Sequence, residues 1–307
     1  MLHKVITLTP ALLLVSATGL AQVKLEHKLT EGSTYTVQTV SSIDQTLTIA
    51  GNGTETKSEI IATSEATVGK RDGEGNIPVT QKTKSLQISI GGTAGEYRFD
   101  SANPDDKGGS PLEILRDVHK ALATQTKTVV HDKDNRVVEI KSDDDTLSKL
   151  PEQVQALARS QLDPDYQKEA ANQGLDIIPS EPVKKGDSWE RTSTADFGAG
   201  QSMEFVTKYT YEGTVESGGR TLDKISAETV SVKFSLADDS PLPIDLKDSE
   251  LKVTESENTV LFDREAGAIV ESKETIRIEG EITFEANGQE LPSELDLKIK
   301  SEVTVQS

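Results

Sequence analysis

The chain alternates apolar and polar residues over unusually long stretches. Odd-numbered residues from Tyr35 to Ile49 form a period-two series whose even-numbered neighbours are mostly Thr, Ser, Gln and Asp. This alternation is typical of a strand with one buried face. Residues 50–54 (AGNGT) predict a hairpin turn, and a weaker apolar series returns from Ile60 to Val68. The first part of the chain is therefore predicted to be an antiparallel meander.

The alternation changes phase in the next strand region. Ile77 and Val79 are odd-numbered, whereas Leu86, Ile88 and Ile90 are even-numbered. A single inserted residue shifts side chains to the other face of a strand. The phase change therefore predicts a β-bulge or a bend between residues 79 and 86.

Three helices are predicted in the middle of the chain, over residues 111–124, 151–162 and 164–173. Ser110 and Glu113 form a capping box around Pro111, and Asp163 caps the third helix before Pro164. The helices need an apolar surface against which to bury their apolar stripes, and the inward faces of the strands are the only such surfaces in the chain. We therefore expect the helices to pack on the concave side of a sheet as a cover or plug. Their apolar stripes are Leu112, Leu115, Val118 and Leu122 in the first helix and Val154, Leu157 and Leu162 in the second.

Strands resume after a proline-rich linker at Ile178–Val183. Alternating series over 203–215, 230–236, 251–262, 269–286 and 291–305 predict a second meander of long strands. We therefore divide the chain into a signal segment (1–21), a first meander with the helices (22–178) and a second meander (179–307), which could share one continuous sheet.

Two features recur in the same order and predict an internal duplication. Gly32–Tyr35 opens the first set of strands, and Gly186–Trp189 opens the second. Later, residues 128–141 match 259–273 at six of fourteen paired positions, if Gly267 is an insertion. If the duplication is real, the hairpins at Asp132 and Asp263 should occupy equivalent places in their meanders.

These motifs carry a resemblance to known proteins. The glycine-x-x-aromatic strand openings, Phe99–Pro104 (FDSANP) and the Phe262–Gly267 hairpin resemble exported proteins of unknown function from planctomycete and verrucomicrobial bacteria. The long meander with inserted helices also resembles, in architecture, the half-barrels of periplasmic lipoprotein carriers. The resemblance implies an exported, β-rich fold. It assigns no activity and no catalytic residue.

The N-terminus predicts export. Lys4 precedes an apolar stretch from Val5 to Ala17, and Gly19 and Ala21 stand at the −3 and −1 positions of a signal-peptidase site. A transmembrane anchor would need about 20 apolar residues, and Thr7, Thr9 and Pro10 interrupt a shorter run. We expect cleavage after residue 21 and a periplasmic or extracellular location.

Charge and composition exclude several classes of function. Lys plus Arg number 33 against 52 Asp plus Glu, a net charge of −19, which disfavours nucleic acid and anionic membranes as partners. The absence of cysteine excludes disulfides, thiolate catalysis and zinc–cysteine sites. An outer-membrane barrel is disfavoured because 6 Phe, 5 Tyr and 1 Trp are too few for two aromatic girdles.

No residue is predicted to be catalytic or to bind a cofactor. His27, His119 and His131 lack ligand spacing, and the motifs of serine hydrolases, zinc proteases and P-loops do not occur. Acidic pairs and runs, at Asp105, Asp132 and Asp143–Asp145 among others, are interpreted as solvated turn acids. The sequence neither predicts nor excludes a metal site, and Asp143–Asp145 is the first candidate for binding calcium. Trp189, the only tryptophan, is interpreted as a core anchor.

The predicted fold is mainly β, with long curved antiparallel sheets forming a half-barrel or barrel-like structure and a helical insertion packed on it. A strand of about 15 residues spans roughly 50 Å, which in a soluble protein implies a strongly curved sheet with a concave side. The leading functional hypothesis is a non-enzymatic exported binding or carrier protein for a lipid or other apolar ligand. A structural module that binds an envelope protein, and a hydrolase of unknown substrate, are the alternatives.

Overall fold

The computed structural model describes residues 22–306 except 94, 107, 143–147, 149, 151–153, 156–157 and 159–161. The predicted signal peptide (1–21) and the acidic run Asp143–Asp145 therefore lie outside the described residues. So does most of the predicted helix 151–162, of which Val154, Ala158 and Leu162 are described as helical and buried.

The described elements are mostly long strands. In the first half these are β1 (Thr34–Ile49), β2 (Asn52–Val68), β3 (Ile77–Gly92), β4 (Tyr97–Asp100), β5 (Thr126–His131) and β6 (Val137–Ser142). In the second half they are β7 (Ser188–Gly198), β8 (Gln201–Ser217), β9 (Arg220–Leu236), β10 (Asp245–Asp263), β11 (Ala268–Ala286) and β12 (Gln289–Gln306). The helical elements are the 3₁₀-helix η1 (Pro111–Leu115), α1 (Arg116–Thr124) and α4 (Pro164–Leu175).

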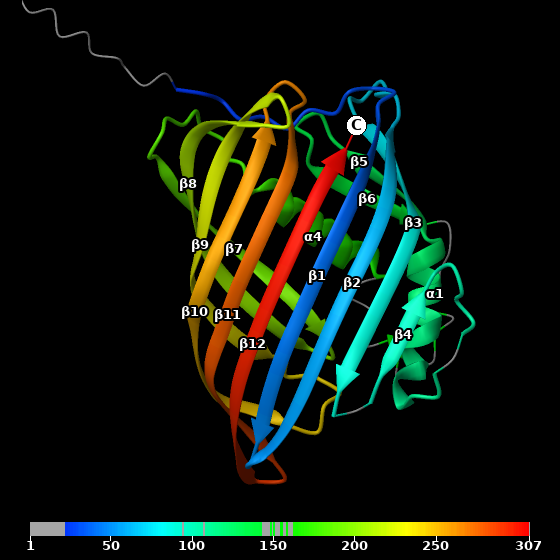
Figure 1. Ribbon diagram of the computed structural model, residues 1–307, viewed down its shortest axis with the longest axis vertical. Helices are drawn as coiled ribbons and strands as arrows, with labels where there is room; N and C mark the ends of the chain where they lie inside the picture. The colour runs from blue at the N-terminus through cyan, green and yellow to red at the C-terminus, as the bar shows by residue number, and fades with distance from the viewer. Residues whose placement is uncertain are drawn as a thin grey trace, which may run out of the picture.

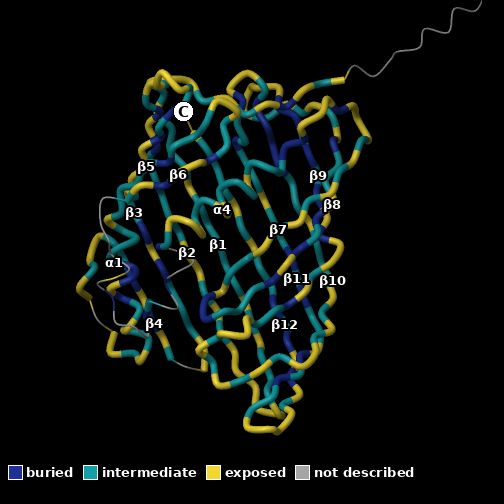
Figure 2. Tube along the Cα trace, turned by 180° about the vertical axis from the view of Figure 1, so that it is seen from behind, coloured by how far each residue is buried: buried dark blue, intermediate teal, exposed yellow. Residues whose placement is uncertain are grey.

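All twelve strands belong to one antiparallel sheet, so the fold class is confirmed. The order is β6-β5-β3-β2-β1-β12-β11-β10-β9-β8-β7, with β4 added beside β3. The two meanders join where β1 pairs with β12, with Ile43 opposite Ile299. The sheet curls so that its edge strands, β6 and β7, lie behind β12 and β1 (Figure 1). Among the described residues these edges do not pair, and α4 lies between them (Figure 2).

Local geometry bears out two sequence predictions. The pairing of β2 with β3 jumps from Thr63–Ser85 to Ser64–Thr83, so Lys84 is the inserted residue behind the phase change. The first hairpin turns through two residues, Ala50 and Gly51, both with positive φ (48° and 82°). A two-residue turn of that hand matches the twist of the flanking strands.

The two meanders repeat the same strand order and register. Strands β1-β2-β3-β5-β6 correspond to β7-β8-β9-β10-β11. Opposite residues run Tyr35, Ala66, Gln81, Lys127 across the first set and Trp189, Tyr209, Ala227, Asn258 across the second. Lys127 and Asn258 differ by 258 − 127 = 131, which is also the offset between Asp132 and Asp263 (263 − 132). The register thus reproduces the alignment of the sequence repeat.

The two matched hairpins also agree in detail. Each has a register shift at its closed end, at Val130/His131 in one and at Leu261/Phe262 in the other. Asp132 Oδ1 accepts two turn amides at 2.9 Å, and Asp263 Oδ1 accepts two at 3.0 Å. The prediction that the two hairpins are equivalent is confirmed.

The helices pack on one face of the sheet, here called the inner face. Val118 of α1 is buried, and its neighbour Leu122 packs on Leu86 and Ile88 of β3. The α4 residues Ala171 and Leu175 pack on a β5–β6 cluster of Val129, Val137 and Ile140. The register places both patches on the same face. The predicted packing of the helices on the concave side is therefore confirmed for α1 and α4.

Helix boundaries differ in part from the prediction. Residues 111–115 form a 3₁₀ turn, and only 116–124 are α-helical. The Ser110 hydroxyl accepts from the Leu112 amide, but Glu113 does not complete the predicted capping box, because it forms an ion pair with the nearly buried Arg116. Leu115 is half-buried and lies outside the apolar clusters of the described residues. The third helix ends at Leu175, slightly beyond its prediction.

Apolar clusters occupy both ends of the inner face. One, near the turn between β1 and β2, is centred on Ile276, Ile278 and Leu297 and includes Phe234 against Phe284. The other, near the N-terminal segment, comprises Leu25, Ile178, Val183, Tyr211, Ile225, Val260 and Phe262. Between them the inward positions are more polar, for example Ser41, Glu274 and Ser301.

Candidate functional site

A cavity of about 450 Å³ opens at one end of the sheet, beneath the N-terminal segment. Its size falls within the usual range of small-molecule sites, about 300–1,000 Å³. Apolar side chains make up much of the lining: Leu29, Tyr35, Val68, Ile269, Val270 and Val305. Strands from both meanders therefore contribute, because β1 and β12 are neighbours in the sheet.

The N-terminal segment (residues 22–33) is held in place over this end of the sheet. Val23 forms an antiparallel bridge with Val183, and Leu25 is buried. The His27 carbonyl accepts from Asn135 Nδ2 at 2.8 Å, and the Lys28 amide donates to the Gly267 carbonyl at 2.9 Å. Both duplicated hairpins thus anchor the segment that covers the cavity.

The contact between Lys28 and the second hairpin requires a glycine at position 267. Its φ is +66°, and a Cβ there would lie 2.4 Å from Cγ of Lys28. The inserted residue of the second hairpin therefore lets the N-terminal segment approach the turn closely.

Two cations stand at the cavity in a chain that is strongly acidic overall. Lys28 Nζ donates to the Arg264 carbonyl at 2.9 Å, and Arg220 pairs with Asp263 at 3.1 Å. Asp263 also accepts hydrogen bonds from two backbone amides of its own turn, so its carboxylate interacts with these amides as well as with Arg220. The lining thus combines an apolar interior with guanidinium and ammonium groups, the pattern that suits an amphiphile with an anionic head.

His27 also lines the cavity but is no acid–base candidate. Its ring packs edge-on against Phe262 with centroids 5.8 Å apart, and burial lowers its pKa. Nε2 is buried and without a hydrogen-bond partner among the described residues. A neutral imidazole in apolar surroundings contributes packing rather than charge.

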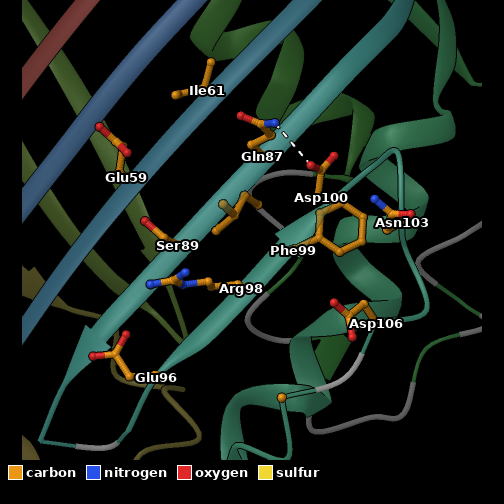
Figure 3. Close-up of a pocket in the computed structure, with 12 residues that line it drawn as sticks. Glu59, Ile61, Gln87, Ser89, Glu96, Arg98, Phe99, Asp100, Asn103 and Asp106 are labelled. Carbon is orange, nitrogen blue, oxygen red and sulfur yellow. Dashed lines mark hydrogen bonds between the residues drawn. The ribbon is translucent and has the colours of Figure 1, made fainter.

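A larger hollow of about 950 Å³ lies on the opposite, outer side of β2 and β3, next to β4 (Figure 3). Polar side chains such as Glu59, Arg98 and Asp106 line it, and Gln87 donates to Asp100 at 3.2 Å. The hollow is open, and its described lining carries four acidic side chains and one basic side chain, that of Arg98.

The remaining histidines have structural partners. The Tyr97 hydroxyl lies 2.7 Å from Nδ1 of His119, and burial followed by the nearby Arg116 lowers the pKa of His119 to about 4. His131 Nδ1 lies 3.0 Å from the Asn135 carbonyl. Neither side chain lies in the apolar cavity.

The predicted core anchor Trp189 is half-buried at the start of β7. Its Nε1 donates to the Ile177 carbonyl at 2.9 Å, and its ring stacks on Tyr209 at 5.9 Å. Several acids cap turns, as Asp132 does, or pair with lysines, as Asp105 does with Lys120. Within the described residues no group of three or more His, Asp or Glu is placed to hold a metal ion. The run Asp143–Asp145 falls outside them.

Sequence reasoning missed the cavity itself and one inner carboxylate, Glu274. The cavity could not be read from the chain because its lining comes from segments as distant as Leu29 and Val305. A signal for Glu274 did exist, because it shares strand parity with the buried Ile276 and Ile278.

Residues 72–219 match the model of a family of unknown function, DUF6263. The matched segment runs from the turn before β3 to the turn after β8 and includes both edge strands and α4. A search of curated proteins finds no match. No described helix has the length and apolar character needed to traverse a bilayer.

Solved structures show only a distant likeness. An outer membrane channel from Pseudomonas putida F1 aligns over 91% of this chain and 97% of its own, at 9% identity and a TM-score of 0.25. The outer membrane protein OprG from Pseudomonas aeruginosa aligns over 92% and 99%, at 6% identity and a TM-score of 0.19. A DUF1329 family protein from Desulfovibrio piger aligns over 87% and 84%, at 7% identity and a TM-score of 0.16. Scores this low carry no argument about fold or function.

Proposed function

We propose that this protein is an exported, non-enzymatic binding or carrier protein of the cell envelope that holds an apolar or amphipathic ligand. The observation that carries the proposal is the apolar cavity of about 450 Å³ between the N-terminal segment and the ends of β1, β2, β11 and β12. Burial of an acyl chain there would gain roughly 0.8 kcal/mol per methylene.

The charge at the cavity supports an anionic head group. Lys28 and Arg220 line it, whereas the chain as a whole has 52 acidic residues against 33 basic ones. A carboxylate or phosphate head beside these two cations would satisfy donors that the protein uses only in part. A ligand with a fatty tail and an acidic head therefore fits best.

The test is binding of cis-parinaric acid, a fluorescent fatty acid, followed by displacement with oleate or with the uncharged oleyl alcohol. We expect saturable binding, with oleate a better competitor than the alcohol. Ala268→Leu places a larger side chain in the cavity and should weaken binding at least tenfold.

Ala286→Leu is the matched control, because Ala286 is also a half-buried alanine of β11 but lies at the far hairpin. It should bind like the parent protein. Lys28→Gln should reduce the preference for oleate over oleyl alcohol while keeping affinity for the alcohol, because Arg220 remains. Absence of saturable binding, or equal loss in both alanine variants, would refute the proposal and favour an envelope interaction module instead.

A further inference from the structure

The N-terminal segment forms one wall of the cavity. Lys28, Leu29 and Thr30 of this segment line the cavity, together with Arg220 and Ile269 from the second meander. A ligand in the cavity therefore touches the segment as well as the sheet.

The segment is attached to the rest of the protein by separate contacts rather than by a continuous ladder. Val23 and Val183 exchange two backbone hydrogen bonds, at 2.7 and 2.8 Å, and Leu25 is buried in the same apolar cluster as Val183. Further backbone bonds join the segment to the two duplicated hairpins, at His27 and at Lys28. Isolated contacts of this kind open at a lower free energy than the centre of a long ladder does.

Gly32 provides a hinge where the segment joins the sheet. Its amide donates to the Val68 carbonyl at 2.9 Å, and the Val68 amide donates to the Ser33 carbonyl at 2.9 Å, so the chain is tied to the sheet from this point on. The φ of Gly32 is +76°, and apart from its chain neighbours no heavy atom lies within 4 Å of the position of a Cβ. A glycine in open space can take up a change in φ and ψ without a clash. The residues before Gly32 can therefore rotate away without disturbing β1.

The contact between the segment and the first hairpin leaves polar atoms unpaired. Nε2 of His27 and Oδ1 of Asn135 are buried, and neither has a hydrogen-bond partner among the described residues. The two residues are in direct contact, because Asn135 Nδ2 donates to the His27 carbonyl at 2.8 Å. A buried polar atom without a partner is less well solvated than the same atom in water, so lifting the segment regains that solvation. This gain offsets part of the cost of exposing Leu25.

We propose that residues 22–31 are a gate that rotates about Gly32 to admit the ligand, and that an anionic ligand holds the gate closed. This inference rests on the proposed function, because it concerns the entry to the same cavity. Lys28 couples the two events, since it belongs to the gate and lines the cavity together with Arg220. A carboxylate that binds both cations joins the gate to the sheet.

Amide hydrogen exchange tests the gate without any ligand. We expect protection factors at Val23 and Lys28 at least tenfold lower than at Ile43, which lies in the middle of the β1–β12 ladder. Gly267→Ala should lower protection at Lys28 at least tenfold further, because the new Cβ would overlap Cβ and Cγ of Lys28. Gly288→Ala is the matched control. It has a similar φ, +76°, at the far hairpin and open space around a Cβ, so it should change nothing at Lys28.

A reversible cross-link tests the passage of the ligand. The chain has no cysteine, so Val23→Cys with Val183→Cys places a single disulfide across the bridge, at the Cα separation of about 5.5 Å that such a pair has. Oxidation should slow both association and dissociation of cis-parinaric acid at least tenfold in stopped-flow fluorescence, and reduction should restore the rates. Ala286→Cys with Gln289→Cys is the control, an opposed pair at the far hairpin whose oxidation should leave the rates unchanged.

Oleate should raise the protection of the Lys28 amide at least tenfold, and oleyl alcohol should raise it less. Protection at Lys28 equal to that at Ile43, equal effects of the two alanine variants, or equal rates in the oxidised and reduced Val23–Val183 variant would each overturn the gate. Saturable binding in the parent protein would then leave the proposed function intact. A parent protein that binds no parinaric acid would instead refute the proposed function, and with it the role of the gate in ligand entry.

Discussion

The side chain of Asn172 in α4 pairs with the main chain of Val137 in β6 as another strand would. Asn172 Nδ2 donates to the Val137 carbonyl and Oδ1 accepts from the Val137 amide, both at 2.9 Å. The next residue of the helix, Gln173, reaches the other sheet edge, where its Oε1 accepts from the Thr194 amide of β7 at 3.1 Å. Helix α4 therefore bridges the two edges of the curled sheet and satisfies backbone groups that an open edge would expose.

Asn172→Ala should destabilise the protein by roughly 1–3 kcal/mol, because Val137 is buried and its amide and carbonyl lose their partners. Urea denaturation at neutral pH measures the loss. Gln173→Ala is the control and should cost less, since Thr194 is exposed and water can replace the lost bond. Equal effects of the two substitutions would contradict a closing role for Asn172.

Apolar contacts of the first helix should differ between neighbouring positions. Val118→Ala removes a side chain that is 3% exposed and should cost roughly 1.5–3 kcal/mol. The sequence places Leu115 in the same apolar stripe, but its side chain is only half-buried, so Leu115→Ala should cost about 1 kcal/mol or less. Thermal denaturation of both variants decides the order, and a larger loss at Leu115 would show that α1 packs through a different face.

Stability should fall as the pH decreases below neutrality, in part through His119. Its pKa is lowered to about 4 in the folded state, so between pH 6.5 and 4 the unfolded chain binds a proton that the native protein does not. Stability from this group is therefore present above pH 6.5 and is lost progressively as the pH falls, by about 2 kcal/mol at pH 5. Urea titrations at pH 7 and pH 5 should show a smaller difference in His119→Asn than in the parent. An unchanged difference would mean that His119 titrates normally.

Gly280 allows β10 and β11 to approach closely. Its φ is +155°, and a Cβ would lie 2.0 Å from the Glu250 carbonyl oxygen. Gly280→Ala should thus destabilise by more than about 1 kcal/mol, because the backbone of β10 has to move. Gly53→Ala serves as the control, since its nearest neighbour would be 3.7 Å from the new Cβ. Circular dichroism melting should separate the two, and a neutral Gly280→Ala would show that the strands can part without cost.

Much of the sheet could be predicted because period-two alternation is a local signal. The odd-numbered series of β1 specified its inward face, and the phase change between Val79 and Leu86 specified a bulge that the structure places at Lys84. The repeated hairpins also predicted equivalent places in the two meanders. The bridging role of α4 could not be predicted, because its cap and proline show only that a helix starts at Pro164 and not which strand edge Asn172 will face.

The residues of the candidate cavity were harder to predict, because distant parts of the chain meet there only in the folded sheet. Leu29, Val68 and Val305 look like ordinary strand or segment residues, and only the pairing of β1 with β12 brings them to one cavity. Glu274 looks like any of the chain's many acids until the parity of β11 is followed across the strands. Export and the resemblance to planctomycete and verrucomicrobial proteins stay predictions.

Native mass spectrometry of the protein purified without detergent from the exporting host tests the central claim most directly. We predict a bound species with an apolar chain and an acidic head, released on denaturation, and much reduced in Ala268→Leu purified in parallel. A parent protein that carries no such species, or an Ala268→Leu variant that carries the same amount, would contradict a ligand in the cavity beneath the N-terminal segment.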